Sequence, residues 1–187
     1  MIFISLVTAW ATAGLYYLGL IHSWHAIDLQ KKEDLKLVHL EPEKWGVYHF
    51  FDSRCSCSHT IIQNLLDRSP LQSRHINERI FYHESLGRFY GPLKAKGYQL
   101  VKINFRESGV TGVPLLVVFD PERNISYAGG YDKKSVNSVF PPNEKKLIYD
   151  IIAGKNQKKL PVIGCSVSKK YQKILDPLGL KYANLRN

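Results

Sequence analysis

An uncharged N-terminal run is the feature that most restricts how this chain can fold. Residues 2–21 read IFISLVTAWATAGLYYLGLI, twenty positions without a charged side chain. As a helix rising about 1.5 Å per residue, the run extends about 30 Å, roughly the thickness of the hydrocarbon layer of a bilayer. Its apolar surface has to be shielded either by lipid or by the rest of the protein. Length and absence of charge favour a single transmembrane anchor over residues 1–23.

Two other interpretations of the run are a cleaved signal peptide and a buried helix. A signal peptide is disfavoured because no Lys or Arg precedes the run, and its small-residue site, Ala11 to Ala13, comes too early.

Lys31, Lys32 and Lys36 follow the run, and positive charge on that side favours a cytoplasmic location for the rest of the chain. Residues 24–44 predict a polar stalk or linker, and the domain then covers 45–187, with a C-terminal extension from about residue 155.

Composition limits the class of this domain. With 187 residues, 44% hydrophobic and 12% aromatic, the chain can bury one ordinary core and is not a disordered protein. Lys and Arg outnumber Asp and Glu by 26 to 16, but the basic residues are scattered and lack the interleaved aromatics of a nucleic-acid module. We therefore expect no nucleic-acid partner, and anionic headgroups are the simpler partner for the positive charge.

Strand and helix patterns alternate along the domain. Short β-rich runs predict strands over 46–51, 79–83, 98–105, 114–120, 125–131 and 160–164. Helical spacing of apolar residues predicts helices over 58–69, 86–97, 144–154 and 167–179. This alternation indicates an α/β domain whose sheet is covered on both faces.

The three cysteines carry the strongest functional signal. Cys55 and Cys57 lie in DSRCSCSHT, where a predicted strand meets a predicted helix. A thiol there faces unpaired backbone N–H groups and the positive end of the helix dipole, which lower its pKa and make it a nucleophile. The alternative is that both are small buried residues of a turn. Cys165, in LPVIGCSVS, is either a third redox thiol or a small core residue.

Two stretches of the chain resemble the thioredoxin superfamily. FFDSRCSCSHTI aligns with the region that carries Trp-Cys-Gly-Pro-Cys in thioredoxins, which places Cys55 at the nucleophile, Cys57 at the proline and Ser58 at the second cysteine. GVTGVPLLVVFDPERNISYAGGY resembles the second hallmark of the family. The resemblance implies a central mixed sheet flanked by helices. It also implies a cis Pro114 facing the nucleophile, with the Val113 backbone offered to an extended substrate.

Between these stretches, RIFYHESLGRFYGPLKAKGYQLVKIN is similar to an insert of TlpA/ResA-like proteins, which are membrane-anchored bacterial thioredoxin-like proteins acting outside the cytoplasm. The match includes Glu84-Ser85 and Gly97. It implies that Glu84 handles a proton near the cysteines, although an exposed glutamate at a helix start is the alternative. It also implies an inner-membrane protein with a periplasmic domain. The positive charge after the apolar run opposes that orientation, which stays open.

The chain departs from the family at the cysteines themselves. Cys-Ser-Cys-Ser replaces Cys-x-x-Cys, so the usual resolving cysteine is missing. A bridge between Cys55 and Cys57 would close a smaller, more strained ring that is more easily reduced. This favours an oxidant or an isomerase over a strong reductant.

Three functions compete on this evidence. The leading hypothesis is thiol–disulfide exchange on exported proteins by a membrane-anchored oxidoreductase that uses Cys55, Cys57 and Glu84 and needs no cofactor. The second is copper delivery, because two thiolates with His59 or His83 suit Cu(I) or Zn(II). The third is a non-catalytic thioredoxin-like adaptor that binds extended peptides around Pro114.

Overall fold

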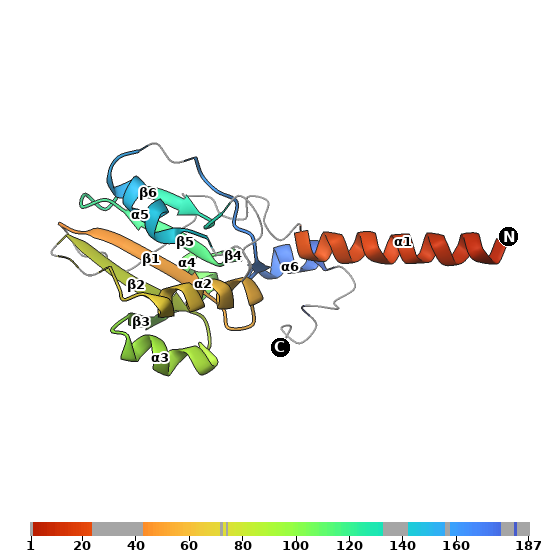
Figure 1. The fold of residues 1–187 in the computed structure, drawn as a ribbon, viewed down its shortest axis with the longest axis horizontal. Coiled ribbons are helices and arrows are strands. Elements are labelled where there is room, and N and C mark those ends of the chain that lie inside the picture. The colour runs from red at the N-terminus through yellow and green to blue at the C-terminus, as the bar shows by residue number, and fades with distance from the viewer. Residues whose placement is uncertain are drawn as a thin grey trace.

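A five-stranded mixed sheet forms the centre of the domain in the computed structural model, which describes residues 2–23, 43–71, 73, 75–132, 142–155, 158–176 and 182 (Figure 1). The strand order is β3-β2-β1-β5-β6. Strands β1, β2 and β3 run parallel, and β5 is antiparallel to both β1 and β6. The bounds are β1 Trp45–Phe51, β2 Ile76–Tyr82, β3 Gln99–Lys102, β5 Leu115–Phe119 and β6 Ile125–Gly129.

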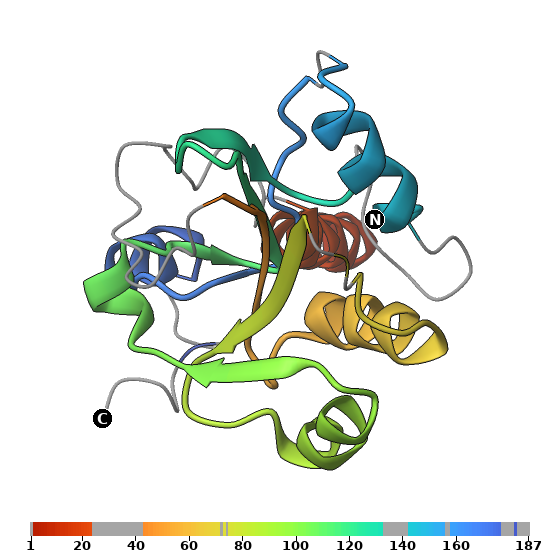
Figure 2. The same cartoon turned by 90° about the vertical axis from the view of Figure 1, so that its left-hand side faces the viewer.

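Helices cover both faces of this sheet, and two short strands lie beside it (Figure 2). The helical elements after the first are α2 Ser56–Asp67, η2 Gly87–Phe89, α3 Tyr90–Ala95, α4 Phe105–Ser108, α5 Glu144–Ile152 and α6 Lys169–Leu175. The short strands β4 Gly112–Val113 and β7 Cys165–Ser166 pair antiparallel with each other.

Successive side chains of β1 point to opposite faces of the sheet, and each face carries its own apolar cluster. Val47 and Phe51 pack with apolar residues of α2, α3 and α5 on one face. Tyr48 and Phe50 point to the other face, where they pack with Phe105 of α4 and with apolar residues of β4 and β5. Because every residue from Val47 to Phe51 is almost completely buried, β1 is the strand on which both layers are assembled.

A buried polar network crosses the first of these clusters. His49 on β1 is fully buried, with its Nε2 2.8 Å from Glu78 Oε1 and its Nδ1 2.8 Å from the Tyr131 hydroxyl. Arg68, which follows α2, bonds the same carboxylate and also Glu144 Oε1 at 3.0 Å. Burial raises the pKa of Glu78, but the hydrogen bonds and charges of His49 and Arg68 outweigh it and hold that pKa at about 2.

Most of the predicted elements are confirmed within a few residues, with three differences. The predicted helix over 86–97 is split into η2 and α3, and the predicted strand over 98–105 ends at Lys102, before the turn of α4. The predicted strand over 160–164 is wrong, because the structure has no strand at these described residues and the strand β7 begins directly after them, at Cys165. Leu160 accepts one bond from Gly130 N at 2.9 Å, but Pro161 has no N–H with which to extend a ladder.

The uncharged N-terminal run forms the helix α1, Ile2–Ser23, which projects from the domain (Figure 1). The hydroxyl of Tyr17 donates to Asp176 Oδ1 at 3.5 Å. Across the residues described, we find no helix with both the length and the apolarity needed to cross a bilayer, so the predicted transmembrane anchor is not confirmed. The predicted stalk falls almost wholly on 24–42, which lie outside the described residues.

The network around Glu78 predicts a pH-dependent contribution to stability. The pKa of Glu78 is lower in the folded chain than the value near 4.3 of an unfolded chain, so the contribution is present above about pH 4.3 and is lost as the pH falls through about 2. We expect Glu78→Gln to lower the free energy of unfolding at pH 7 by about 3 kcal/mol. The difference in the free energy of unfolding between this variant and the wild type should shrink as the pH falls toward 2, as measured by urea denaturation.

The matched control is Glu122→Gln, in the exposed turn before β6. It should leave the free energy of unfolding within about 0.5 kcal/mol of the wild type at every pH. A Glu78→Gln deficit of the same size at pH 7 and pH 2 would contradict the proposed linkage.

Candidate active site

Cys55 occupies the N-cap of α2, where the chain leaves the sheet. β1 ends at Phe51, a turn follows, and the Cys55 amide donates to Asp52 O at 3.0 Å. The Cys55 carbonyl then accepts from His59 N at 3.2 Å, which is the first turn of the helix. The side chain of Cys55 makes no capping hydrogen bond and is fully buried in the second apolar cluster.

The other two thiols lie beside Cys55. Cys57 is on the first turn of α2, and Cys165 is on β7, opposite Val113 of β4. Hydrogen bonds from Cys165 and Cys57, and then from Ser58, hold the pKa of Cys55 well below its usual value, although burial acts to raise it. All three cysteines lie in the described part of the chain, and all three are thiols.

The backbone next to Pro114 meets the nucleophile directly. The Cys55 thiol donates to Val113 O at 3.5 Å, and Val113 is fully buried. The Val113–Pro114 peptide bond is cis, as the resemblance implied. The use of Val113 and Pro114 for binding a substrate stays a prediction.

Charged residues link the start of α2 to the loop after β2. Asp52 is 5% exposed, and its carboxylate accepts from Arg54 N, Nε and Nη2 at 2.7–2.9 Å. Arg54 Nη1 lies 3.4 Å from Glu84 Oε2, and His83 Nε2 lies 3.6 Å from the other oxygen of Glu84. The side chain of Glu84 is 61% exposed, and its part in proton transfer stays a prediction.

Asp52 is not among the site residues predicted from the sequence. Asp52 directly follows a buried strand and lies two residues before a cation. That position could have indicated that it holds Arg54 in place. The link between Glu84 and Arg54 had no sign in the sequence, because the two residues come from different strand ends.

The structure does not gather the candidate copper ligands. His59 Nε2 lies 2.6 Å from Ser53 O, and its ring packs against Phe89. His83 stacks on Phe105 with ring centroids 5.3 Å apart. Within the residues that the structure describes, no group of three or more His, Cys, Asp or Glu side chains is placed to hold a metal ion.

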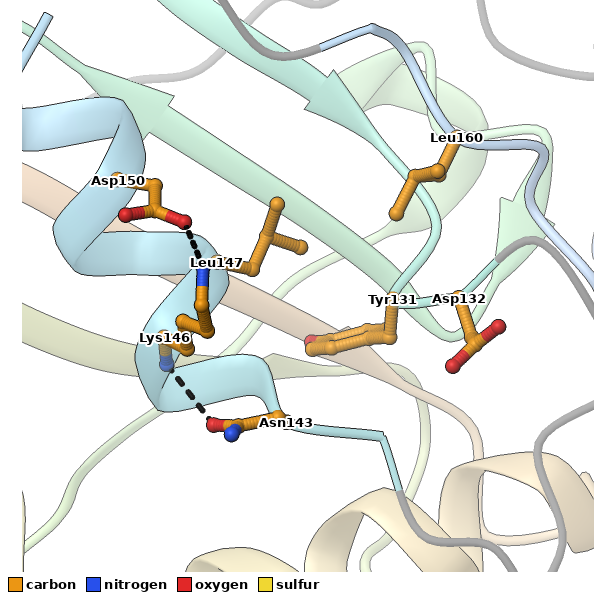
Figure 3. Close-up of a pocket in the computed structure, with 7 residues that line it drawn as sticks. All are labelled: Tyr131, Asp132, Asn143, Lys146, Leu147, Asp150 and Leu160. Carbon is orange, nitrogen blue, oxygen red and sulfur yellow. Dashed lines mark hydrogen bonds and ion pairs between the residues drawn. The ribbon is translucent and has the colours of Figure 1, made fainter. Parts of the chain in front are cut away.

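A pocket of about 460 Å³ lies away from the thiols, between α5 and the chain that leaves β6 (Figure 3). Seven residues line it: Tyr131, Asp132, Asn143, Lys146, Leu147, Asp150 and Leu160. Asn143 caps α5 by accepting from Lys146 N at 3.0 Å. None of the predicted site residues lines this pocket.

Comparisons with known proteins bear on the fold. The sequence matches no protein-family model and no curated protein. An uncharacterized conserved protein from Geobacillus kaustophilus superposes with a TM-score of 0.51 at 15% identity, covering 67% of this chain and 77% of its own. The N-terminal domain of PilB from Neisseria gonorrhoeae gives 0.43 at 13% identity, over 63% and 81% of the two chains. DsbF of MTB gives 0.39 at 14%, over 60% and 81%.

These likenesses concern the fold alone, and the two lower scores add nothing to its assignment. The sheet order, with parallel β1 to β3 and antiparallel β5 and β6, makes this a mixed α/β domain whose architecture is consistent with a thioredoxin-like fold. The narrower similarity to TlpA/ResA-like proteins is not confirmed and stays a prediction.

The hydrogen bonds to Cys55 predict that this thiol ionises more readily than an ordinary cysteine. We expect the absorbance of the full chain at 240 nm to show one thiol titrating well below the usual cysteine pKa of about 8.5. Cys55→Ser should remove this transition. Cys165→Ala should move it to higher pH, because the strongest hydrogen bond to Cys55 is lost.

Ser58→Ala should move the transition in the same direction by less, since the bonds from Ser58 are weaker. If the low transition survived Cys55→Ser, the thiolate would belong to another cysteine.

Proposed function

We propose that this chain carries out thiol–disulfide exchange on protein substrates, with Cys55 as the nucleophile. The observation that carries the proposal is the Cys55 thiol itself, which lies at the start of a helix beside two further thiols and the Val113 carbonyl. A thiolate held in such a position attacks disulfides and also leaves easily from them.

The exchange proceeds in two balanced steps. The Cys55 thiolate attacks one sulfur of a substrate disulfide, forms a mixed disulfide and releases the other substrate sulfur as a thiolate, which takes up a proton. A second thiol of this chain then gives up its proton and attacks Cys55 Sγ. That attack releases the substrate as a dithiol and leaves a disulfide in this chain. A dithiol reductant restores the starting state, and a more oxidising disulfide partner drives the same steps in reverse.

The surroundings support roles for the other predicted residues. Cys57 is one candidate for the second thiol, since its thiol is hydrogen-bonded to Cys55 in the reduced state. The Val113 backbone and Pro114 would receive an extended segment of the substrate. Glu84, whose side chain is 61% exposed, would exchange protons with solvent. Stable disulfide substrates occur in oxidising compartments, which favours exported proteins as the targets.

The test is thiol trapping of the full chain across a glutathione redox series. The chain is alkylated after denaturation at each potential, and its intact mass counts the thiols that remain. We expect two cysteines, one of them Cys55, to lose alkylation together in a reversible two-electron step. Cys55→Ser should abolish that step. If all three thiols stayed alkylatable at every potential, the proposal would be wrong.

A further inference from the structure

A segment of the chain itself already lies along β4. We call residues 160–168 the strap. Within it, β7 pairs with β4 so that Ser166 is opposite Gly112 and Cys165 is opposite Val113. The pairing continues past β7, because Val167 N donates to Thr111 O at 3.0 Å. The strap thus uses the same backbone that the proposed function offers to an extended substrate.

Three glycines allow the strap to lie this close. A Cβ at Gly164 would lie 2.0 Å from Val113 O and 2.6 Å from Pro114 Cδ. Gly130 meets the strap at its other end, where a Cβ would lie 1.9 Å from Pro161 O. Gly129 is similarly close to Leu160 O, at 2.7 Å. These separations are shorter than any side chain tolerates, so the strap is packed against the backbone on both sides of its path.

The strap is also anchored by burial. Val162 is 1% exposed and belongs to the same apolar cluster as Cys55. Ser166 is buried, and its amide donates to the Tyr182 hydroxyl at 3.1 Å. The strap therefore has a defined place over β4, and that place puts Cys165 next to Cys55.

We propose that the strap is a built-in occupant of the substrate-binding edge, and that Cys165 is the resolving thiol for Cys55. The inference rests on the proposed function. It assigns the second thiol of the exchange to Cys165, which stands where the cysteine of a bound substrate would lie. A substrate segment has to displace the strap from β4 before it reaches Cys55, and the strap returns to complete the reaction.

The local geometry of α2 supports Cys165 over Cys57 for this role. Cys57 is only two positions after Cys55, so a disulfide between them would close a small, strained ring. Cys165 approaches from a separate strand and needs no change in the helix. The hydrogen bond from Cys165 is also the largest of the influences that lower the pKa of Cys55.

In the resolving step, Cys165 displaces the substrate from Cys55. Cys165 gives up its proton and attacks Cys55 Sγ in the mixed disulfide, which forms the Cys55–Cys165 bond and breaks the bond to the substrate. The substrate sulfur leaves as a thiolate and takes up a proton. The substrate is reduced by two electrons, and this chain is oxidised by two. The strap is then held covalently across β4 until a dithiol reduces the bond.

The first test treats the full chain with oxidised glutathione and identifies which two cysteines form a disulfide. Tryptic cleavage after Arg54, Arg68 and Lys159 places Cys55 and Cys57 on one peptide and Cys165 on another. We expect a peptide cross-linked between Cys55 and Cys165, with Cys57 alkylated. Cys57→Ser should still form the cross-link, whereas Cys165→Ser should accumulate a glutathione adduct on Cys55.

The outcomes separate the two proposals. A Cys55–Cys57 bond within one peptide, with no cross-link, would overturn the role of Cys165 and leave thiol exchange intact. A chain that takes up neither an internal bond nor glutathione would overturn the exchange itself.

The second test asks whether the strap covers Cys55. In a chain with both Cys57 and Cys165 replaced by Ser, Gly164→Ala should raise the rate of Cys55 alkylation by N-ethylmaleimide about tenfold, because the added methyl group clashes with Val113 O. The matched control is Gly91→Ala in α3, where a Cβ meets nothing within 4 Å. Equal rates in the two variants, with cooperative unfolding of both, would show that the strap does not guard Cys55.

Discussion

The site depends on the position of β1 between β2 and β5. Because β1 is paired on both edges, the chain that leaves it emerges from the middle of the sheet, and α2 has to start there. The register then sets Phe50 opposite Leu115. The residues just before β5, Val113 and Pro114, are thereby brought beside the residues just after β1, which include Cys55. The contact between Cys55 and Val113 O follows from sheet register more than from any local preference of either segment.

Burial gives the thiols an unusual setting. A fully buried thiol surrounded by apolar side chains would ordinarily resist ionisation. Here the other two thiols and Ser58 supply hydrogen bonds that water supplies elsewhere, and they outweigh the cost of burial. The arrangement combines a reactive sulfur with restricted access. A segment covering the nucleophile would keep the thiolate from unselective oxidation, and its removal by a suitable partner would then be part of recognition.

Two groups of charged residues in the described part of the domain have different roles. His49 and Glu78 are buried on the face of β1 opposite to Cys55, and the half-buried Arg68 joins them there, so that the three connect β1, β2 and the end of α2. Asp52 and Arg54 act at the edge, where they shape the turn that presents Cys55. Asp52 shows why local sequence alone misses such roles, because only the fold reveals which cation a carboxylate holds.

The sequence by itself determined most of the strand and helix order and the placement of Cys55 at a strand–helix junction, since apolar periodicity and short-range spacing encode these. The thioredoxin-like fold was implied by the resemblance of two motifs to that superfamily. Only the tertiary structure decided which thiols meet. Cys165 lies more than a hundred residues from Cys55 and reaches it through pairing between β4 and β7, two strands of two residues each that carry no periodicity to detect. The tight path past Gly130 and Gly164 is likewise a property of packing between distant segments, which no local pattern records.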